Sequence, residues 1–377
     1  MNKKIVILHP AFWKQAMGGA EIQIKYLVDF LLKKNVQVHY VYEDKGTAIG
    51  TVMHENLILH PLSRIKLSKR FGNRWFLYRN KINYILNEVQ PDGIYTRFFS
   101  SWSGFASEYA LKNNIPHIWA IASDNDLKVL ERSISLIKPL DIIENRYVKR
   151  AFKLATVIIV QNIWQEAELQ QKHNRKGLFL KQAAPYDNQS IVVKSETVLK
   201  IVWIANMKSL KRPDLFVNLV KHFREFKEVK FEMIGRMMPK YNNIIKQEEE
   251  NNAMFEYLGE LSNTEVNKVL LGADILINTS DYEGFSNTFI QAWLRKNIVM
   301  SMNSNPDDIL TTYEVGFLCP TIDQMIQKIT FLKKNKDVLR TMQSRAMEYV
   351  LEEHNLENNL NIIANLLKIE ENGSTLV

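Results

Sequence analysis

The polar stretch at residues 278–293 carries the side chains with the clearest chemical use. The apolar run Ala273–Asn278 is typical of a buried strand, and a helical pattern begins near Asn287. Glu283 lies in the loop between them, where a carboxylate can accept hydrogen bonds from sugar hydroxyls. Ser286 or Asn287 is a natural N-cap, and the free amides of the first helical turn can bind phosphate oxygens. From spacing alone, a solvated loop acid is the simpler interpretation.

A pair of glycines near the N-terminus is a second candidate. Gly18 and Gly19 follow the apolar run Lys4–Leu8 and precede a helical pattern that starts at Ala20. Glycines let backbone amides approach a ligand closely, and the positive end of a helix attracts phosphate. A diphosphate would suit both features, although a tight turn is the commoner reason for such a pair. No G-x-G-x-x-G fingerprint follows an expected strand, which disfavours a dinucleotide oxidoreductase.

Alternating strands and helices are expected to position these candidate residues. In the first half we expect strands at Lys4–Leu8, Val36–Val41, Gly93–Arg97, Pro116–Ala122, Ala155–Val160 and Leu178–Lys181. In the second half we expect them at Leu199–Ala205, Val229–Ile234, Phe255–Leu258, Ala273–Asn278 and Ile298–Met302. Helical segments between the strands predict an α/β fold with two doubly wound parallel sheets. Ligands of such sheets bind beyond the carboxyl ends of the strands.

The domain boundary is expected in the patternless stretch Pro185–Thr197. It separates an N-terminal domain, 1–190, from a C-terminal domain, 191–377. Helices in the second domain are expected at Pro213–Phe226, Thr264–Leu271 and Asn287–Arg295, and the tail Ile322–Ile369 is helical in pattern. The last helix can pack back on the N-terminal domain.

Composition excludes several classes of protein. The chain has 377 residues, of which 46% are hydrophobic and 24% charged, as in an ordinary globular protein rather than a disordered one. No apolar run approaches the ~20 residues of a membrane span. The N-terminal apolar run is too short for a signal peptide, and the single cysteine, Cys319, cannot form an internal disulfide. We therefore expect a cytoplasmic location.

Charge is uneven along the chain. Residues 1–190 contain 27 Lys and Arg against 16 Asp and Glu, whereas the rest of the chain is slightly acidic. The segment Arg64–Lys81 is strongly basic and includes the aromatic residues Phe71, Trp75, Phe76 and Tyr78. This pattern fits a peripheral contact with anionic lipid on the inner face of a membrane. A helix with its aromatic rings in the core is the alternative, and no nucleic-acid-binding motif accompanies the charge.

Three motifs taken together resemble a known family. They are Gly18-Gly19-Ala20-Glu21, Lys211-Arg212-Pro213 and Glu283-Gly284-Phe285-Ser286-Asn287-Thr288-Phe289-Ile290-Gln291-Ala292-Trp293. The sequence resembles the family 4 retaining glycosyltransferases, or glycosyl transferases group 1, and within them the bacterial surface-polysaccharide branch. The resemblance implies the GT-B fold, in which two Rossmann-like domains face a cleft. It also implies that the N-terminal domain binds the acceptor and the C-terminal domain the nucleotide-sugar donor.

The resemblance further implies roles for individual residues. Gly18 and Gly19 would present amides near the donor diphosphate, and Lys211 would neutralise charge on the leaving group. Glu283 would hold hydroxyls of the transferred sugar, and the amides that line the sugar and phosphates would be those of Gly284, Phe285, Ser286, Asn287 and Thr288. Gln291 stands where the family has an acid that holds the ribose, and an amide can still bond ribose hydroxyls.

Two further positions depart from the family pattern. Asn206 replaces an arginine, so diphosphate neutralisation would rest on Lys211, with Lys208 or Arg212 as possible helpers. A histidine of the N-terminal domain is absent where Asp124 or Asp126 could lie near the acceptor hydroxyl. Helix capping or a solvated turn is the commoner role for such acids.

Two histidines, His9 and His117, are weaker alternatives for a role near the acceptor hydroxyl, because histidines at strand ends are often structural. Asp124-Asn125-Asp126 has the D-x-D form of a manganese site but lies in the wrong domain for the donor. We expect neither a metal nor a cofactor.

The sequence thus predicts a retaining hexosyltransferase that uses a UDP- or GDP-linked sugar. The expected acceptor is a lipid-linked saccharide of a cell-surface polysaccharide. Transfer to a small soluble acceptor remains an alternative, as does a catalytically weakened nucleotide-sugar-binding or scaffold protein. Donor hydrolysis without acceptor would separate an enzyme from a binding protein.

Overall fold

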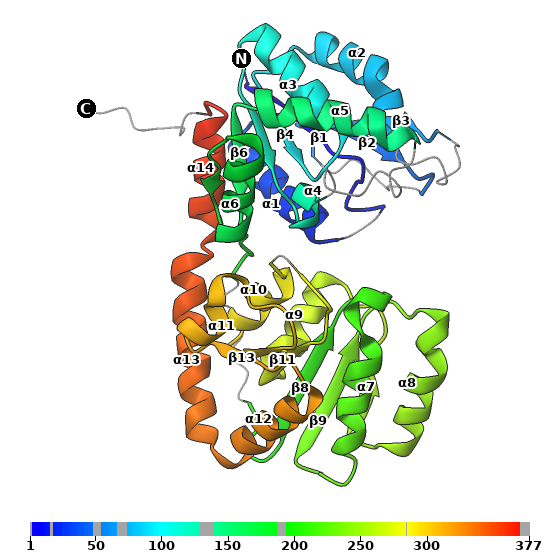
Figure 1. Ribbon diagram of the computed structural model, residues 1–377, viewed down its shortest axis with the longest axis vertical. Coiled ribbons are helices and arrows are strands. Elements are labelled where there is room, and N and C mark those ends of the chain that lie inside the picture. Colours follow the sequence, from blue (N-terminus) through cyan, green and yellow to red (C-terminus); the bar gives the residue numbers. More distant parts are fainter. Residues whose placement is uncertain are drawn as a thin grey trace, which may run out of the picture. The chain divides into compact units, whose positions relative to one another are not determined.

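The computed structural model describes residues 2–15, 18–47, 54–65, 74–128, 139–186, 194–283 and 285–369. The described chain forms two compact units (Figure 1). Unit 1 contains the described residues up to Gln182 together with those from Leu356 onward, and unit 2 contains those within Ala183–Asn355. The last helix, α14 (Leu356–Leu366), therefore belongs to unit 1, where Asn359 donates a hydrogen bond to the carbonyl of Lys181 (2.7 Å).

Unit 1 is built on a parallel sheet with the strand order β3-β2-β1-β4-β5-β6-β7. Its strands are β1 (Lys4–Leu8), β2 (Gln37–Asp44), β3 (Leu57–Ser63), β4 (Gly93–Arg97), β5 (His117–Ala120), β6 (Val157–Val160) and β7 (Leu178–Phe179). The central strands β1 and β4 are buried along almost their whole length, as expected for a parallel sheet covered on both faces.

Helices flank this sheet and supply its core. They are α1 (Gly19–Lys33), α2 (Arg79–Val89), α3 (Ser101–Asn113), α4 (Asn125–Lys128), α5 (Pro139–Leu154) and α6 (Ile163–His173), with a 3-10 turn η2 (Trp75–Tyr78). Val6 and Ile94 on one face of the sheet pack in a cluster with Trp102 and Phe105 of α3. The alternation of side chains along each strand places these residues on one face of the sheet. Helix α1 contacts β2 and α14.

Unit 2 is built on a second parallel sheet, with the order β10-β9-β8-β11-β12-β13. The strands are β8 (Leu199–Ile204), β9 (Val229–Ile234), β10 (Phe255–Tyr257), β11 (Ile275–Asn278), β12 (Ile298–Ser301) and β13 (Gly316–Leu318). The helices are α7 (Pro213–His222), α8 (Pro239–Asn251), α9 (Asn263–Gly272), α10 (Asn287–Trp293), α11 (Ile309–Thr312), α12 (Ile322–Lys334) and α13 (Lys336–Glu353), with 3-10 turns η5 (Ser209–Lys211) and η6 (Pro306–Asp308).

The predicted fold class, two doubly wound parallel sheets, is confirmed. Every strand expected from the sequence is present, but the structure adds β3 and β13. The third strand carries Pro61, which cannot donate a ladder hydrogen bond, and lies at the sheet edge where proline is tolerated. Among the described residues, no helix has the length and apolar character needed to cross a membrane.

Candidate functional site in unit 2

Two loops meet at the carboxyl ends of β8 and β11. The first runs through η5 to Arg212, which has a left-handed backbone (φ 48°), and Pro213 then begins α7. The second follows Asn278. Thr279 joins the two loops, because its hydroxyl donates to the carbonyls of Lys211 (2.8 Å) and Arg212 (3.0 Å). Trp203 of β8 donates to the same hydroxyl (2.9 Å), so the position of Lys211 is fixed from the sheet below.

Lys211 and Glu283 form an ion pair at this junction. The Glu283 side chain is only 10% exposed, and its carboxylate also accepts from Ser280 Oγ (2.8 Å) and Asn278 Nδ2 (3.3 Å). Burial acts to raise the pKa of Glu283, but the Lys211 ammonium and the hydroxyl donors outweigh it, so the pKa is lowered. Glu283 is therefore a buried, ionised carboxylate surrounded by donors.

The loop continues into the short helix α10. Gly284 lies outside the described residues, and Phe285 packs against His354 with ring centroids 5.0 Å apart. Ser286 is the N-cap residue and makes no side-chain cap bond, its hydroxyl lying 2.8 Å from that of Thr288. Asn287 and Thr288 occupy the first turn, where backbone amides have no intrahelical partner. These amides lie a few residues beyond Glu283.

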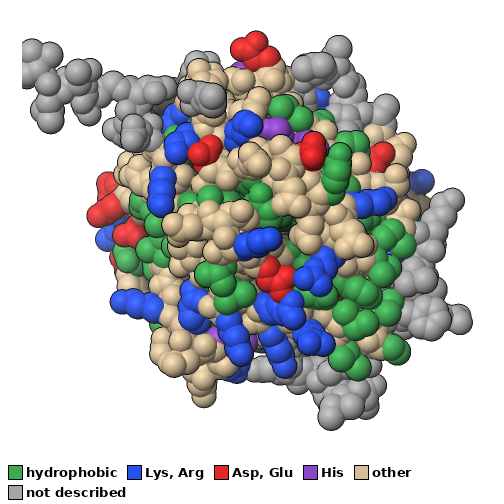
Figure 2. Space-filling model, turned by 90° about the horizontal axis from the view of Figure 1, so that it is seen from above, with side chains coloured by type: hydrophobic (Ala, Val, Ile, Leu, Met, Phe, Trp, Pro, Cys, Tyr) green, Lys and Arg blue, Asp and Glu red, His purple; other side chains and the backbone are tan. Residues whose placement is uncertain are grey.

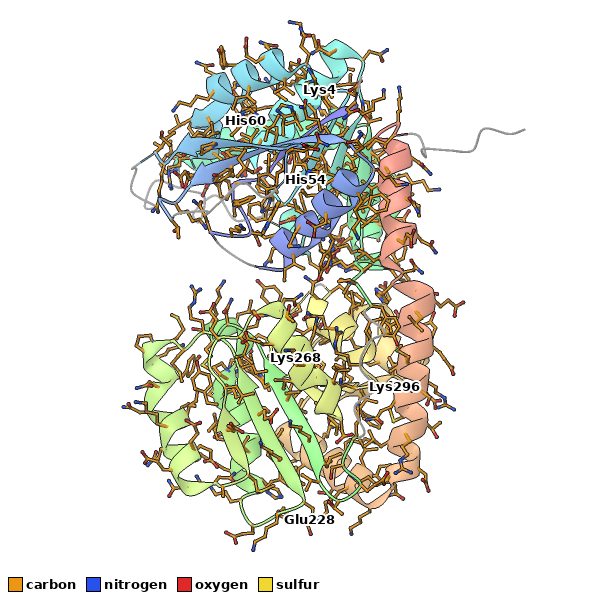
Figure 3. The ribbon with its side chains drawn as sticks, turned by 180° about the vertical axis from the view of Figure 1, so that it is seen from behind. Lys4, His54, His60, Glu228, Lys268 and Lys296 are labelled. Carbon is orange, nitrogen blue, oxygen red and sulfur yellow. The ribbon has the colours of Figure 1, made fainter. Side chains whose placement is uncertain are left out.

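Gln291 lies one turn further along α10 and is only 6% exposed. Its amide nitrogen donates to Asn263 (2.5 Å) and Asn267 (3.3 Å) of α9, the helix on which Figure 3 labels Lys268. The side-chain nitrogen is thus used within unit 2. The atom of Gln291 that would contact ribose hydroxyls is therefore its amide oxygen.

The remaining positions of the donor motif differ in exposure. Asn206 and Lys208 are exposed in the loop after β8, and the amide of Lys208 donates to the carbonyl of Asn206 (2.6 Å). Arg212 binds Asp214 (2.9 Å) and Asp281 (3.3 Å), and these hydrogen bonds raise its pKa further. Of the expected site residues in unit 2, the structure brings Lys211 into direct contact with Glu283 and holds Arg212 beside them.

In unit 1, Gly18 caps the N-terminus of α1 and Gly19 begins the helix. A Cβ atom on Gly18 would lie 2.7 Å from Glu21 Oε2, so the Glu21 side chain would have to shift to admit a larger residue there. Glu21 Oε1 lies 3.0 Å from His9 Nε2, and His9 Nδ1 lies 3.0 Å from the carbonyl of Arg97. Burial opposes ionisation of Glu21, but His9 outweighs it and the pKa of Glu21 is lowered.

The two acids expected near the acceptor bind other parts of unit 1. Asp124 accepts from Gln165 Nε2 (2.9 Å) and Asn162 Nδ2 (3.2 Å) at the start of α6. Asp126 is 2% exposed and accepts from the amides of Ala122 (2.7 Å) and Ser123 (3.3 Å). Burial raises the pKa of Asp126 to about 6 despite these amides. Both carboxylates therefore stabilise the loop after β5, and a role for either as a base stays a prediction.

His117 is fully buried between Thr96 Oγ1 (2.9 Å) and Ser107 Oγ (2.8 Å), and burial lowers its pKa to about 3. These contacts give it a structural role. Among the described residues, no three or more His, Cys, Asp or Glu side chains are grouped so that they could hold a metal ion. The region of Asp124-Asn125-Asp126 is part of the chain for which this holds.

Sequence reasoning missed Arg97, the last residue of β4. Its guanidinium is buried and lies close enough to Asp126 for its charge to lower the pKa of that carboxyl, while its backbone carbonyl contacts His9. The available signal was a charged residue at the end of an otherwise uncharged strand, Gly93–Arg97, at the edge where ligands of parallel sheets bind.

Comparison with known proteins agrees with this geometry. The family model described as glycosyl transferases group 1 matches residues 187–349, and that described as glycosyltransferase family 4 matches residues 17–176. No protein of curated function matches the sequence.

Solved structures share the whole fold at low sequence identity. Sucrose-phosphate synthase from Thermosynechococcus elongatus is 13% identical with a TM-score of 0.75, covering 97% of this chain and 98% of that one. HepE from Anabaena, solved with UDP and glucose, is 12% identical with a TM-score of 0.71, covering 97% and 100%. WaaG, a glycosyltransferase involved in lipopolysaccharide biosynthesis, is 12% identical with a TM-score of 0.70, covering 96% and 99%.

The two family models together span most of both units, and the structural likeness extends over the whole described fold. The chain belongs to the glycosyl transferases of group 1 and is a glycosyltransferase of the GT-B fold.

Proposed function

We propose that this glycosyltransferase moves a hexose from a nucleotide diphosphate sugar to an acceptor hydroxyl with retention of configuration. The observation that carries the proposal is the partly buried Lys211–Glu283 pair at the carboxyl ends of β8 and β11. It combines a cation for a diphosphate with a carboxylate for sugar hydroxyls. Retention follows from the resemblance to the retaining family and from nothing in the geometry.

The pair suits the charge changes of such a transfer. When the bond between the anomeric carbon and the diphosphate oxygen breaks, its electron pair remains on the diphosphate. The Lys211 ammonium can turn toward that growing negative charge, while Glu283 keeps Ser280 and Asn278 as donors and gains sugar hydroxyls. Preorganised charges in a buried site are the largest single contribution to many such reactions. In this proposal, Lys211 and the backbone amides at the start of α10 stabilise the negative charge on the departing diphosphate, and no metal ion takes part.

The proposed donor is linked to UDP or GDP, and unit 2 binds it. HepE, with which this chain shares its fold, was solved with UDP and glucose. In the proposal Gln291 contacts the ribose through its amide oxygen, and Asn206, Lys208 and Arg212 lie around the diphosphate. The role of Gly18 and Gly19 near the donor diphosphate is the one that the resemblance implies.

The proposed acceptor is a lipid-linked saccharide of a cell-surface polysaccharide, and unit 1 binds it. WaaG acts in lipopolysaccharide biosynthesis and has the same fold. The excess of basic residues in 1–190 also favours an anionic surface or substrate. A small soluble acceptor is the competing outcome.

The membrane contact is proposed for Arg64–Lys81, of which 66–73 lie outside the described residues. Tyr78 is buried, and Trp75 and Phe76 pack against the core, so these three rings face inward as in the alternative weighed from the sequence. Apolar contact with lipid is therefore assigned to other side chains, Leu77 (45% exposed) and Tyr84 (66%). Figure 2 shows Lys and Arg side chains beside hydrophobic ones on the face viewed from above.

A thermal-shift screen of UDP, GDP and their sugars against the full chain tests the donor. We expect one nucleotide series to raise the Tm, and we expect slow release of its nucleoside diphosphate from the sugar donor without acceptor. Binding without any such release, alone or with saccharide acceptors, would favour the binding-protein alternative.

Liposome co-sedimentation tests the membrane contact. We expect binding to anionic but not neutral vesicles, reduced when Lys66, Lys69 and Arg70 are changed to Glu. A matched variant carries Glu at three exposed lysines of unit 2, Lys221, Lys227 and Lys268. Equal loss in both variants, or no binding to either lipid, would favour a soluble acceptor.

A further inference from the structure

Arg97 is a buried cation whose hydrogen-bonding capacity the protein does not use. It is 6% exposed, and its guanidinium donates a long hydrogen bond from Nη1 to Tyr95 Oη (3.4 Å). Its Nε and Nη2 have no hydrogen-bond partner within the described part of the chain. A buried charge without a partner is costly, so proteins usually pair such groups or use them to bind a ligand.

The two unused nitrogens form one edge of the guanidinium. That edge binds a carboxylate or phosphate through two parallel hydrogen bonds. This chain uses the same edge elsewhere: Arg236 donates from Nε (2.9 Å) and Nη2 (2.8 Å) to the two oxygens of Glu260. Arg224 holds Glu248 in the same way. Arg97 differs from both in having no carboxylate on this edge among the described residues.

Nearby acids are committed to other partners. Asp126 is close enough for the charge of Arg97 to lower its pKa against the effect of burial, but its carboxylate binds the amides of Ala122 and Ser123. Glu21 binds His9, which in turn contacts the carbonyl of Arg97. The His9 contact holds the backbone of Arg97, and the Nε–Nη2 edge is left without a hydrogen-bonded carboxylate among the described residues.

The chain after Arg97 is also held in an unusual conformation. Phe98 has a φ of 84°, in the left-handed region that is rare for an aromatic residue. Its amide donates to Ala120 (3.1 Å) and its carbonyl accepts from Trp119 Nε1 (3.2 Å), which secures this turn against β5. The strand end that carries Arg97 is therefore rigidly placed at the carboxyl edge of the sheet.

We propose that the Nε–Nη2 edge of Arg97 binds an anionic oxygen group, a phosphate or a carboxylate, on the acceptor. The proposal rests on the proposed function in one respect, that unit 1 receives the acceptor. Because the nitrogens are buried, the anion leaves water on binding and the charge interaction acts at low dielectric. Arg97 then selects acceptors that carry such a group close to the sugar.

Binding of small probes to the full chain tests this without turnover. The probes are glucose 1-phosphate, glucuronate, inorganic phosphate and, as a neutral control, glucose, each followed by Tm and by calorimetric titration. Arg97→Met should raise the Kd for the preferred anionic sugar at least about tenfold, with a smaller rise for Arg97→Lys, which keeps the charge but loses the paired donors. Arg150→Gln, which removes a partly exposed arginine of α5 in unit 1, should leave this Kd unchanged.

Stability gives a second readout. Without ligand, the Tm of Arg97→Met should equal or exceed that of the wild type, because no protein hydrogen bond on the charged edge is lost. A clear fall in Tm together with unchanged probe binding would mean that Arg97 serves the fold alone, and would overturn the proposal.

The probes also separate the sources of the anion. Tighter Arg97-dependent binding of glucose 1-phosphate identifies a phosphoryl group, and tighter binding of glucuronate identifies a carboxylate. Equal binding of inorganic phosphate and glucose 1-phosphate would overturn the assignment to the acceptor and leave a site for the free ion. If Arg97-dependent binding of an anionic sugar occurs but no nucleotide sugar is ever turned over, the proposed function fails and the anion site stands.

Discussion

The carboxyl edges of the two sheets both bury acidic side chains, but they pair them differently. In unit 2, Glu283 has the Lys211 ammonium as its counter-charge, and its pKa is lowered despite burial. In unit 1, Asp126 is buried against backbone amides, and its pKa is raised to about 6. Glu144 of α5 accepts from the amides of Ser101 (2.7 Å) and Phe76 (3.1 Å), and burial raises its pKa to about 7.

The difference shows that a counter-charge in direct contact lowers the pKa of a buried carboxylate, whereas amide donors do not offset burial at Asp126 and Glu144. Unit 2 keeps a compact pair of opposite charges, which suits a ligand that carries both a diphosphate and hydroxyls. In unit 1, Asp126 and Glu144 hold loops, and the paired-donor edge of Arg97 has no hydrogen-bond partner among the described residues. The two edges therefore favour different ligands.

The largest expected effect comes from removing the cation of unit 2. Lys211→Ala should reduce transfer by on the order of 2–4 kcal/mol of transition-state stabilisation, because the departing diphosphate loses its charge contact. Steady-state release of nucleoside diphosphate measures this. Lys221→Ala, on the exposed side of α7, is the matched control and should retain full activity. Turnover close to the wild type in a folded Lys211→Ala variant would remove Lys211 from the mechanism.

A smaller but selective effect is expected from the two positions of the donor motif. Glu283→Gln should lose more activity than Gln291→Glu, since it removes the charge that pairs with Lys211 and leaves only a neutral amide oxygen to accept from sugar hydroxyls. In Gln291→Glu, the amides of Asn263 and Asn267 can turn to donate to the new carboxylate. Comparing kcat and KM for the donor checks the order. A reversed order would exchange the roles assigned to the two positions.

The smallest expected effect is on stability in unit 1. Because the pKa of Glu144 is raised to about 7 from an ordinary 4.5, the folded protein holds the proton more tightly than the unfolded chain. The free energy of unfolding should therefore fall as pH rises from about 4.5 to 7, by on the order of 1–3 kcal/mol from this group. Glu144→Gln should flatten this part of the profile in urea titrations.

The exposed Glu88 of α2 provides the control for Glu144, and Glu88→Gln should leave the pH profile unchanged. If the wild type and Glu144→Gln lose stability in parallel between about pH 4.5 and 7, the pKa of Glu144 is not raised by burial against backbone amides. The contrast with Glu283, which pairs with a cation, would then not extend to Glu144.

The sequence predicted the strands well where apolar runs were continuous and internal to a sheet. The bounds of β1, β4 and β9 agree with the expected ranges. The missed strands lie at sheet edges: β3 contains Pro61, and β13 has only the residues Gly316–Leu318, too few to show a pattern. Edge strands are half exposed and short, so their hydrophobic signal is weak.

The site was less accessible to sequence reasoning. Lys211 and Glu283 are separated by 72 positions, and only the resemblance to a family brought them together. For Asp124 and Asp126, the sequence favoured capping or a solvated turn, and the observed amide and side-chain contacts fit a stabilising role. The sequence contains almost no indication of a role for Arg97. That role depends on two guanidinium nitrogens that lack hydrogen-bond partners among the described residues, and this follows from the packing of several segments.

Calorimetric titration of UDP and GDP into the wild type and Lys211→Met tests the assignment of the donor site most directly. The assignment predicts that one of the two nucleotides binds the wild type and that its Kd rises at least about tenfold, or 1.4 kcal/mol, in the variant. Binding of that nucleotide with equal affinity to both proteins would contradict the assignment of the donor diphosphate to the Lys211–Glu283 pair.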